Sequence, residues 1–417
     1  MLLNAWIWSS LGLAPTLVTT ALSQGLPAAQ PGRLGLSAAG LARLDSVMQV
    51  YVTDGKLAGL VVAVAKDGRL AHLKAFGLRS VEAKDPMETS DLFRIYSMTK
   101  PITSTAAMIL VEEGKIGLDD PVAKYLPAFG GVKVWTREGL VPPRRPMTVR
   151  DLLRHTSGLT YGFFGETPVD SMYRRIPPPA NLADLTDNLA KLPLVGHPGE
   201  VWNYSYSTDV LGRVVEVASG QSLDRFFEER IFVPLKMKDA FFQVPAEKRS
   251  RLTGNYSRPA PGRFLLVDSP DSGNYTRPPK MLSGGGGLVA STADYLRFAQ
   301  MILNGGELDG TRLLKSGTVV EMLRNQLPGE MVPAVGALMR LDGTGFGLGF
   351  NVIVNGRDPL RGSNGTASWA GIANTYFFID PVTKVIGVLM TQFNPFAAYP
   401  IEDEFRHLVY RALGEVR

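Results

Sequence analysis

The chain contains no cysteine, and only four of its 417 residues are histidines. Without cysteine there is no disulfide bond, no thiol nucleophile and no metal site with cysteine ligands, and such a chain suits an oxidising compartment. The histidines show no HExxH pair or other spacing typical of metal ligands; they are His72, His155, His197 and His407. We therefore predict no metal and no organic cofactor, and we expect the histidines to have structural roles.

Neither sign of charge is in large excess. The formal net charge is +5 at pH 7, and the sequence shows no basic run interleaved with aromatic residues. Nucleic-acid binding is therefore not predicted. With 45% hydrophobic and 20% charged residues, the composition is typical of a globular protein with a sizeable core, and the length suggests roughly two to three domains or two interleaved subdomains.

The N-terminus lacks positive charge, because no lysine or arginine precedes Arg33. Its apolar stretch, which ends in small residues near position 22, fits the core and cleavage site of a secretory signal, but the basic residues that normally open such a signal are missing. A glycine and a proline inside the stretch argue against a membrane-spanning helix. We interpret residues 1–30 as a signal peptide or a disordered leader. A periplasmic or secreted location is slightly favoured over the cytoplasm, without stable membrane insertion.

Similar patterns occur near both ends of the remaining chain. A helical pattern at 37–56 precedes two strands joined by an Asp-Gly turn in 57–80, and 367–393 predicts two strands that meet at an Asp-Pro turn, followed by a closing helix at 402–416. This order predicts an α/β (α+β) fold with one antiparallel sheet, built from both chain ends and flanked by helices.

The middle of the chain is mostly helical, with proline-rich breaks between helices and a Ser-Gly-Gly-Gly-Gly run at 283–287. We therefore expect a sheet domain from residues 31–96 and 288–417, and a mostly helical domain from residues 97–287. A cleft between two such domains is a common place for a ligand site.

Ser97 and Lys100 are three residues apart at the predicted start of an amphipathic helix. At this spacing they share one face of the first turn, and the positive end of the helix dipole favours negative charge that develops on the serine oxygen. A desolvated lysine can act as a base near neutral pH. The alternative is an ordinary helix cap followed by a solvated lysine, and spacing alone leaves both open.

Two tyrosines, Tyr204 and Tyr206, stand just ahead of another amphipathic helix. A phenol at this place could reach the cleft, although a tyrosine before a helix is more often structural. No G-x-S-x-G motif occurs, which argues against an α/β-hydrolase.

Taken together, these segments resemble the serine β-lactamase-like superfamily and, within it, the family VIII carboxylesterases, over nearly the full length after residue 35. The segments that carry the resemblance are Ser97-Met98-Thr99-Lys100, 147–159, 198–216, 282–306 and Trp369-Ala370-Gly371. The resemblance implies a β-lactamase/penicillin-binding-protein-like fold with the active site between a sheet domain and a helical domain.

The resemblance also implies a role for each matching residue. Ser97 would be the nucleophile, and Lys100 and Tyr204 the proton-transfer pair. The backbone amides of Ser97 and Ile372 would form the oxyanion hole.

Two departures from the wider superfamily bear on the substrate. The Lys-Thr-Gly of β-lactamases is replaced by Trp369-Ala370-Gly371, and the tyrosine motif continues to Tyr206 instead of asparagine. Both changes remove polar groups suited to an anionic, peptide-like substrate. The predicted substrate-binding residues are Trp369, Gly371, Tyr206, Tyr161 and Phe164, and the aromatic segment 161–180 is interpreted as a pocket rim or lid, or alternatively as a core aromatic cluster.

The function predicted from the sequence is therefore a carboxylesterase that acts on small-molecule esters with short acyl chains. Alternatives are a β-lactamase, a D-alanyl peptidase-like enzyme or an acyltransferase of the same fold, and a non-catalytic protein that is acylated and stalls. Lys315-Ser316-Gly317 imitates a lactamase motif, but it opens a predicted helix and is interpreted as structural. The sequence indicates no oligomeric state.

Overall fold

The computed structural model describes residues 25–260, 263–329, 331–335, 339–341, 343–356, 358 and 360–414. Most of the predicted leader, residues 1–24, lies outside this range. Among the described residues, no helix combines the length and apolar character that crossing a membrane requires.

The main sheet joins the two ends of the chain, as predicted. Its strand order is β15-β16-β17-β18-β19-β1-β2-β3, all neighbours are antiparallel, and β19 pairs with β1 from Leu60↔Thr391 to Lys66↔Val385. The strands are β1 (Gly59–Lys66), β2 (Arg69–Ser80), β3 (Asp85–Pro86), β15 (Thr344–Phe346), β16 (Asn351–Ile353), β17 (Ala367–Ala370), β18 (Tyr376–Asp380) and β19 (Val385–Thr391).

Turn chemistry explains the strand boundaries. Asp67 and Gly68 both adopt positive φ between β1 and β2, as a two-residue hairpin turn of this type requires. The prediction of two strands in 367–393 was wrong in number, because β17 forms a third. Asn374, with φ 62° and its amide hydrogen-bonded to the Gly371 carbonyl at 2.9 Å, separates β17 from β18.

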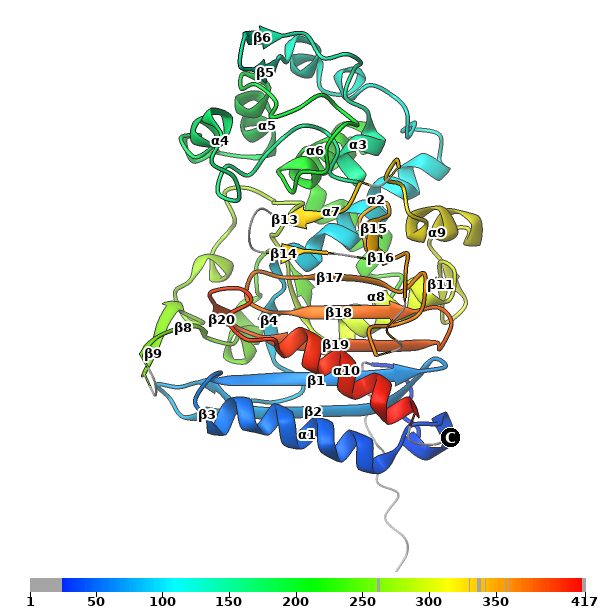
Figure 1. The fold of residues 1–417 in the computed structure, drawn as a ribbon. Coiled ribbons are helices and arrows are strands. Elements are labelled where there is room, and N and C mark those ends of the chain that lie inside the picture. Colours follow the sequence, from blue (N-terminus) through cyan, green and yellow to red (C-terminus); the bar gives the residue numbers. More distant parts are fainter. Residues whose placement is uncertain are drawn as a thin grey trace, which may run out of the picture.

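Helices cover both faces of the sheet (Figure 1). The first and last long helices, α1 (Ala38–Thr53) and α10 (Ile401–Gly414), lie side by side on one face, and α8 (Thr292–Leu303) packs behind the sheet. Strand β1 contributes side chains to the hydrophobic cores on both faces of the sheet. Val62 packs in the core with α1 and α10, and Val61 packs in the core with α8. The strand is therefore hydrophobic throughout, as expected when both faces are buried.

The chain between β4 and β10 carries most of the other helices. They are α2 (Thr99–Glu112), α3 (Val149–Leu153), α4 (Pro168–Tyr173), α5 (Leu182–Ala190), α6 (Ser207–Ser219) and α7 (Leu223–Phe227), and α9 (Ser316–Leu323) follows later. Short strands are β4 (Leu92–Arg94), β5 (Val134–Thr136), β6 (Gly139–Val141), β7 (Ala240–Phe241), β8 (Asn255–Ala260), β9 (Arg263–Asp268), β10 (Val289–Ser291), β11 (Glu307–Leu308), β12 (Thr311–Arg312), β13 (Ala334–Val335), β14 (Met339–Arg340) and β20 (Phe393–Asn394). The domain boundaries at 96 and 288 stay a prediction.

The helix that follows Ser97 differs from its prediction. A 3₁₀ turn, Tyr96–Met98, comes first, and α2 begins at Thr99. Every residue from Thr99 to Leu110 is buried, because α2 packs against α6 and α7 in the centre of the molecule. The predicted amphipathic helix is therefore a central helix that is buried on all sides, which removes Lys100 from solvent.

Candidate active site

Ser97 sits in a constrained turn. The preceding residue, Tyr96, has φ 41°, a left-handed conformation that is costly for a bulky residue and typical of functional sites. Tertiary contacts hold it there, since the Ile95 amide donates to the Leu288 carbonyl at 3.0 Å and Asn255 Nδ2 donates to Tyr96 Oη at 3.1 Å. As a result, Ser97 lines a large cavity, which we call the main pocket.

Lys100 lies directly behind the serine. Its Nζ donates to Ser97 Oγ at 3.1 Å and to the Gly285 carbonyl at 2.7 Å, and the residue is 1% exposed. The same Nζ is 4.6 Å from the ring centroid of Tyr204 and 5.4 Å from that of Tyr161. A desolvated cation is strongly attracted to such ring faces. The three predicted catalytic residues are therefore brought together around one buried ammonium group.

Tyr204 is held by aromatic neighbours and one hydrogen bond. Trp369 Nε1 donates to Tyr204 Oη at 3.3 Å, so the ring that replaces the lactamase lysine contributes a donor to the phenol. The Tyr204 ring lies 4.9 Å from His155 and stacks at 6.1 Å on Trp202, measured between centroids. The sequence predicted Trp369 only as a pocket wall and missed this contact.

The end of β17 approaches the serine turn closely. A Cβ added to Gly371 would lie 2.5 Å from the Ile95 carbonyl oxygen and 2.2 Å from Thr375 Oγ1. Only glycine fits there. The next residue, Ile372, is 42% exposed and lines the same pocket as Ser97, so the two predicted oxyanion donors belong to adjoining segments.

The main pocket has a volume of about 770 Å³. Ser97, Tyr204 and Ile372 line it. All of the predicted substrate-binding residues line it too, namely Tyr161, Phe164, Tyr206, Trp369 and Gly371. Burial and the Asp209 charge raise the pKa of Tyr161 well above the ordinary phenol value and also raise the pKa of Tyr206. Both hydroxyls therefore stay protonated near neutral pH and can donate hydrogen bonds.

Asp209 is a site residue that the sequence analysis missed. It is 2% exposed, lines the main pocket, and accepts hydrogen bonds from Ser283 Oγ at 2.5 Å and the Gly285 amide at 3.1 Å. Burial raises the pKa of Asp209, while the Ser283 hydrogen bond and the Lys100 charge oppose that rise. A Cβ on Gly285 would lie 2.4 Å from Asp209 Oδ2. The absence of a side chain at Gly285 therefore lets its backbone carbonyl reach Lys100. The sequence signal for Asp209 was an acidic residue in the first turn of the helix that follows the tyrosine motif.

His155 has a structural role. It is 1% exposed, and burial together with the Lys100 charge holds the pKa of His155 well below its ordinary value. The imidazole is therefore neutral near pH 7 and supplies packing for Tyr204. Its backbone carbonyl accepts the Asn203 amide at 2.9 Å, and the Thr156 carbonyl accepts the Gly199 amide at 2.7 Å. The 155–156 turn thus fixes the segment that carries Tyr204.

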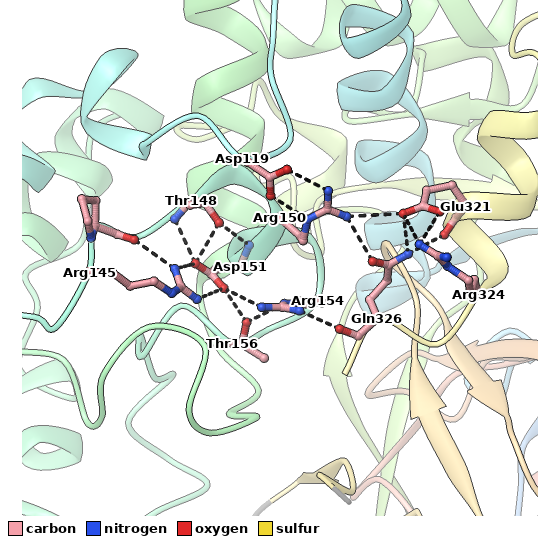
Figure 2. A network of polar contacts seen from close by, with 11 residues as sticks. Asp119, Arg145, Thr148, Arg150, Asp151, Arg154, Thr156, Glu321, Arg324 and Gln326 are labelled. Atoms are coloured by element: carbon pink, nitrogen blue, oxygen red, sulfur yellow. Dashed lines mark hydrogen bonds and ion pairs between the residues drawn. The ribbon is translucent and has the colours of Figure 1, made fainter. Parts of the chain in front are cut away.

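A buried carboxylate anchors that turn (Figure 2). Asp151 is fully buried and accepts hydrogen bonds from Arg145, Thr148, Arg154 and Thr156, with Arg145 Nη1 at 2.6 Å and Thr156 Oγ1 at 2.8 Å. Burial alone would raise the pKa of Asp151, but the hydrogen bonds from Arg145, Thr148 and Thr156 outweigh burial and lower the pKa to about 2. Asp151 is therefore ionised near neutral pH, and both of its carboxylate oxygens accept hydrogen bonds.

The same network reaches the segment after α9. Arg154 Nη1 donates to the Gln326 carbonyl at 2.6 Å, and Arg150 bonds both Asp119 and the Gln326 side chain. Lys315, which opens α9, is exposed and lies outside the residues that line the main pocket. Its Lys-Ser-Gly motif starts a helix, as predicted.

Known proteins share both this sequence pattern and this fold. A family described as Beta-lactamase matches residues 44–411. The chain belongs to that family. It is 36% identical over 361 residues to Protein Rv1367c of Mycobacterium tuberculosis, covering 82% of this chain and 87% of the relative. It is 33% identical over 387 residues to Esterase EstB of Burkholderia gladioli, covering 87% and 93%.

A solved structure supports the same assignment. EstCE1, described as a hydrolase with promiscuous acyltransferase activity, matches with a TM-score of 0.77 and 26% identity, covering 89% of this chain and 98% of that structure. The predicted fold and the predicted resemblance to β-lactamase-like serine esterases are confirmed. The family is one of serine hydrolases with esterase and acyltransferase members.

Proposed function

We propose that this chain is a carboxylesterase that hydrolyses esters of short acyl chains through an acyl-enzyme on Ser97. The observation that carries the proposal is the position of Lys100, whose Nζ is 3.1 Å from Ser97 Oγ and 4.6 Å from the Tyr204 ring centroid while the residue is 1% exposed. The names of two relatives, Esterase EstB and Lovastatin esterase, support an ester as substrate.

In the acylation step, Ser97 Oγ attacks the ester carbonyl carbon and its proton passes to the Tyr204 phenolate. The Lys100 ammonium stabilises that phenolate, assisted by the hydrogen bond from Trp369. The backbone amides of Ser97 and Ile372 stabilise the tetrahedral oxyanion, where each donor contributes about 3 kcal/mol. The carbon–oxygen bond to the alcohol then breaks, and the alcohol oxygen takes its proton from Tyr204.

Water completes the cycle. It loses a proton to Tyr204 while its oxygen attacks the acyl carbon, and Ser97 regains a proton as the carboxylic acid leaves. The large apolar ring of Trp369 in place of a lysine cation favours neutral esters over anionic β-lactams.

Transfer of the acyl group to an alcohol is a second candidate activity. The pocket volume of about 770 Å³ leaves room for an acceptor alcohol beside the acyl group, and EstCE1 is described as having promiscuous acyltransferase activity. Product analysis in the presence of a competing alcohol distinguishes the two: new ester indicates transfer, and free acid alone indicates hydrolysis.

The proposal is tested with p-nitrophenyl esters from acetate to decanoate, beside the β-lactam nitrocefin, using wild type, Ser97→Ala and Tyr204→Phe. We expect fastest turnover on the shortest esters, little on nitrocefin, and loss in both variants. Comparable nitrocefin turnover would favour a β-lactamase, and full activity of Ser97→Ala would contradict the proposal.

A further inference from the structure

A second cavity adjoins the main pocket. We call it the side pocket; its volume is about 270 Å³, and it is lined by Tyr161, Phe163, Tyr173, Arg174, Ile176, Pro177, Pro179, Leu185, Tyr206 and Met281. Four of these residues also line the main pocket, namely Tyr161, Phe163, Tyr206 and Met281. The two cavities therefore adjoin and share part of their lining.

The wall of the side pocket is preformed. Asp170, in α4, accepts Thr160 Oγ1 at 2.6 Å and the Thr167 amide at 2.9 Å, which fastens the 160–167 segment to that helix. A Cβ on Gly162 would lie 2.8 Å from the Asp170 carbonyl oxygen. Close packing and these hydrogen bonds hold the 160–167 segment against α4.

The wall of the side pocket is mostly apolar, and its polar side chains are three tyrosines and Arg174. Tyr173 is 2% exposed, and its hydroxyl has no hydrogen-bond partner among the described residues. Burial raises the pKa of Tyr173 far above the ordinary phenol value, so the hydroxyl remains a donor. The hydroxyl oxygen has almost no accessible surface, so the ring of Tyr173, and not its oxygen, lines the cavity. The Arg174 guanidinium already donates to the Gly162 and Gly165 carbonyls.

The position of Tyr204 decides which part of an ester reaches this cavity. In the proposed reaction Tyr204 protonates the leaving alcohol, so the alcohol part lies on the Tyr204 side of Ser97. The Tyr204 ring centroid is 5.3 Å from that of Tyr161, which is 4.6 Å from that of Tyr206. Both of these neighbours belong to the wall shared with the side pocket.

We propose that the side pocket binds the distal end of the substrate's alcohol part, a neutral, apolar group. The inference rests on the proposed function, because the mechanism fixes the orientation of the ester. It names the substrate class as short-acyl esters of long or bulky alcohols.

The test keeps the acyl group constant and varies the alcohol. Acetate esters of ethanol, hexanol, decanol and 6-methoxyhexanol are compared in wild type, in Ile176→Trp, which fills the cavity, and in Val320→Trp, a matched change at a site on α9 that is 67% exposed. We expect the kcat/KM ratio of decyl over ethyl acetate to fall at least about tenfold in Ile176→Trp and to stay unchanged in Val320→Trp. The methoxyhexyl ester, whose distal end is polar, should gain less from the side pocket than the decyl ester. An unchanged ratio in Ile176→Trp would overturn the proposal.

Binding of the free alcohols separates this proposal from the reaction itself. The increase in melting temperature that decanol or 6-methoxyhexanol causes is measured in the Ser97→Ala protein, with and without Ile176→Trp. A shift that Ile176→Trp abolishes supports the side pocket even if Ser97 proves not to be the nucleophile. If Ser97-dependent hydrolysis is found but Ile176→Trp leaves the shift intact, the side pocket is rejected and the esterase proposal stands. If Ile176→Trp changes kcat/KM equally for all of the acetates and no alcohol binding is detected, the side-pocket proposal is also contradicted.

Discussion

At the residue scale, the ring of Tyr204 contacts two tryptophans, and only one of them donates a hydrogen bond to the Tyr204 hydroxyl. Trp369 Nε1 donates to Tyr204 Oη at 3.3 Å, whereas Trp202 Nε1 is buried without a partner among the described residues and its ring only stacks on Tyr204. This difference allows the hydrogen bond to be separated from aromatic packing.

Replacing Trp369 with phenylalanine should therefore cost more activity than the same change at Trp202. A hydrogen bond to a charged group contributes about 1.5–3 kcal/mol, so we expect kcat for p-nitrophenyl acetate to fall roughly ten- to hundredfold in Trp369→Phe. Trp202→Phe, the matched control, should change kcat by less than about threefold. Equal losses in both variants would show that ring packing, and not the donor, supports Tyr204.

At the element scale, β17 is aligned against the serine turn by a glycine. In Gly371→Ala, the new methyl group meets the Ile95 carbonyl and Thr375 Oγ1, and overpacking of this kind costs about 1–3 kcal/mol. We expect a lower melting temperature and a large loss of kcat, because Ile372 moves away from Ser97. Gly317→Ala in α9 is the control, since a Cβ there meets nothing within 4 Å and alanine favours a helix. Native-like activity of Gly371→Ala would contradict the alignment.

The buried carboxylate of Asp151 in α3 predicts that the stability of the fold depends on pH. The pKa of Asp151 is lowered to about 2 in the folded protein from an ordinary value of 3.8. Because the folded pKa is the lower one, the ionised carboxylate stabilises the fold above pH 4, and this stabilisation, about 2 kcal/mol, is lost as the pH falls from about 4 to 2.

Urea unfolding of wild type and Asp151→Asn between pH 7 and pH 2.5 tests this. The variant should be less stable near pH 7, where Arg145 and Arg154 lose their anionic partner, and the difference should shrink below pH 4. A difference that stays constant over this range would show that Asp151 stabilises the fold by packing instead of charge.

At the scale of the whole molecule, sequence patterns predicted those parts of the fold that depend only on residues close together in the chain. The Asp67-Gly68 hairpin and the closing helix follow from turn residues and periodicity within short windows. The burial of α2 and the contact between the Gly285 carbonyl and Lys100 could not be predicted in this way. The contact joins residues 185 positions apart, and the burial of α2 depends on α6 and α7, which follow much later in the chain.

The same reasoning explains what was missed in the site. Ser97, Lys100 and Tyr204 were predicted from a resemblance in motifs that are contiguous in sequence. Asp209 and the Trp369–Tyr204 hydrogen bond were missed because their partners come from other elements. The Asn374 turn was overlooked because it uses an asparagine at positive φ without a proline or glycine beside it.

We propose Ser97 as the nucleophile of this chain. The most direct test is peptide mapping by mass spectrometry after incubation with a p-nitrophenyl alkylphosphonate, which forms a stable ester with an activated serine. We predict one phosphonyl group per chain, located on Ser97, with release of one equivalent of p-nitrophenol and no label in Ser97→Ala. A label on another residue, or labelling that persists in Ser97→Ala, would contradict the account.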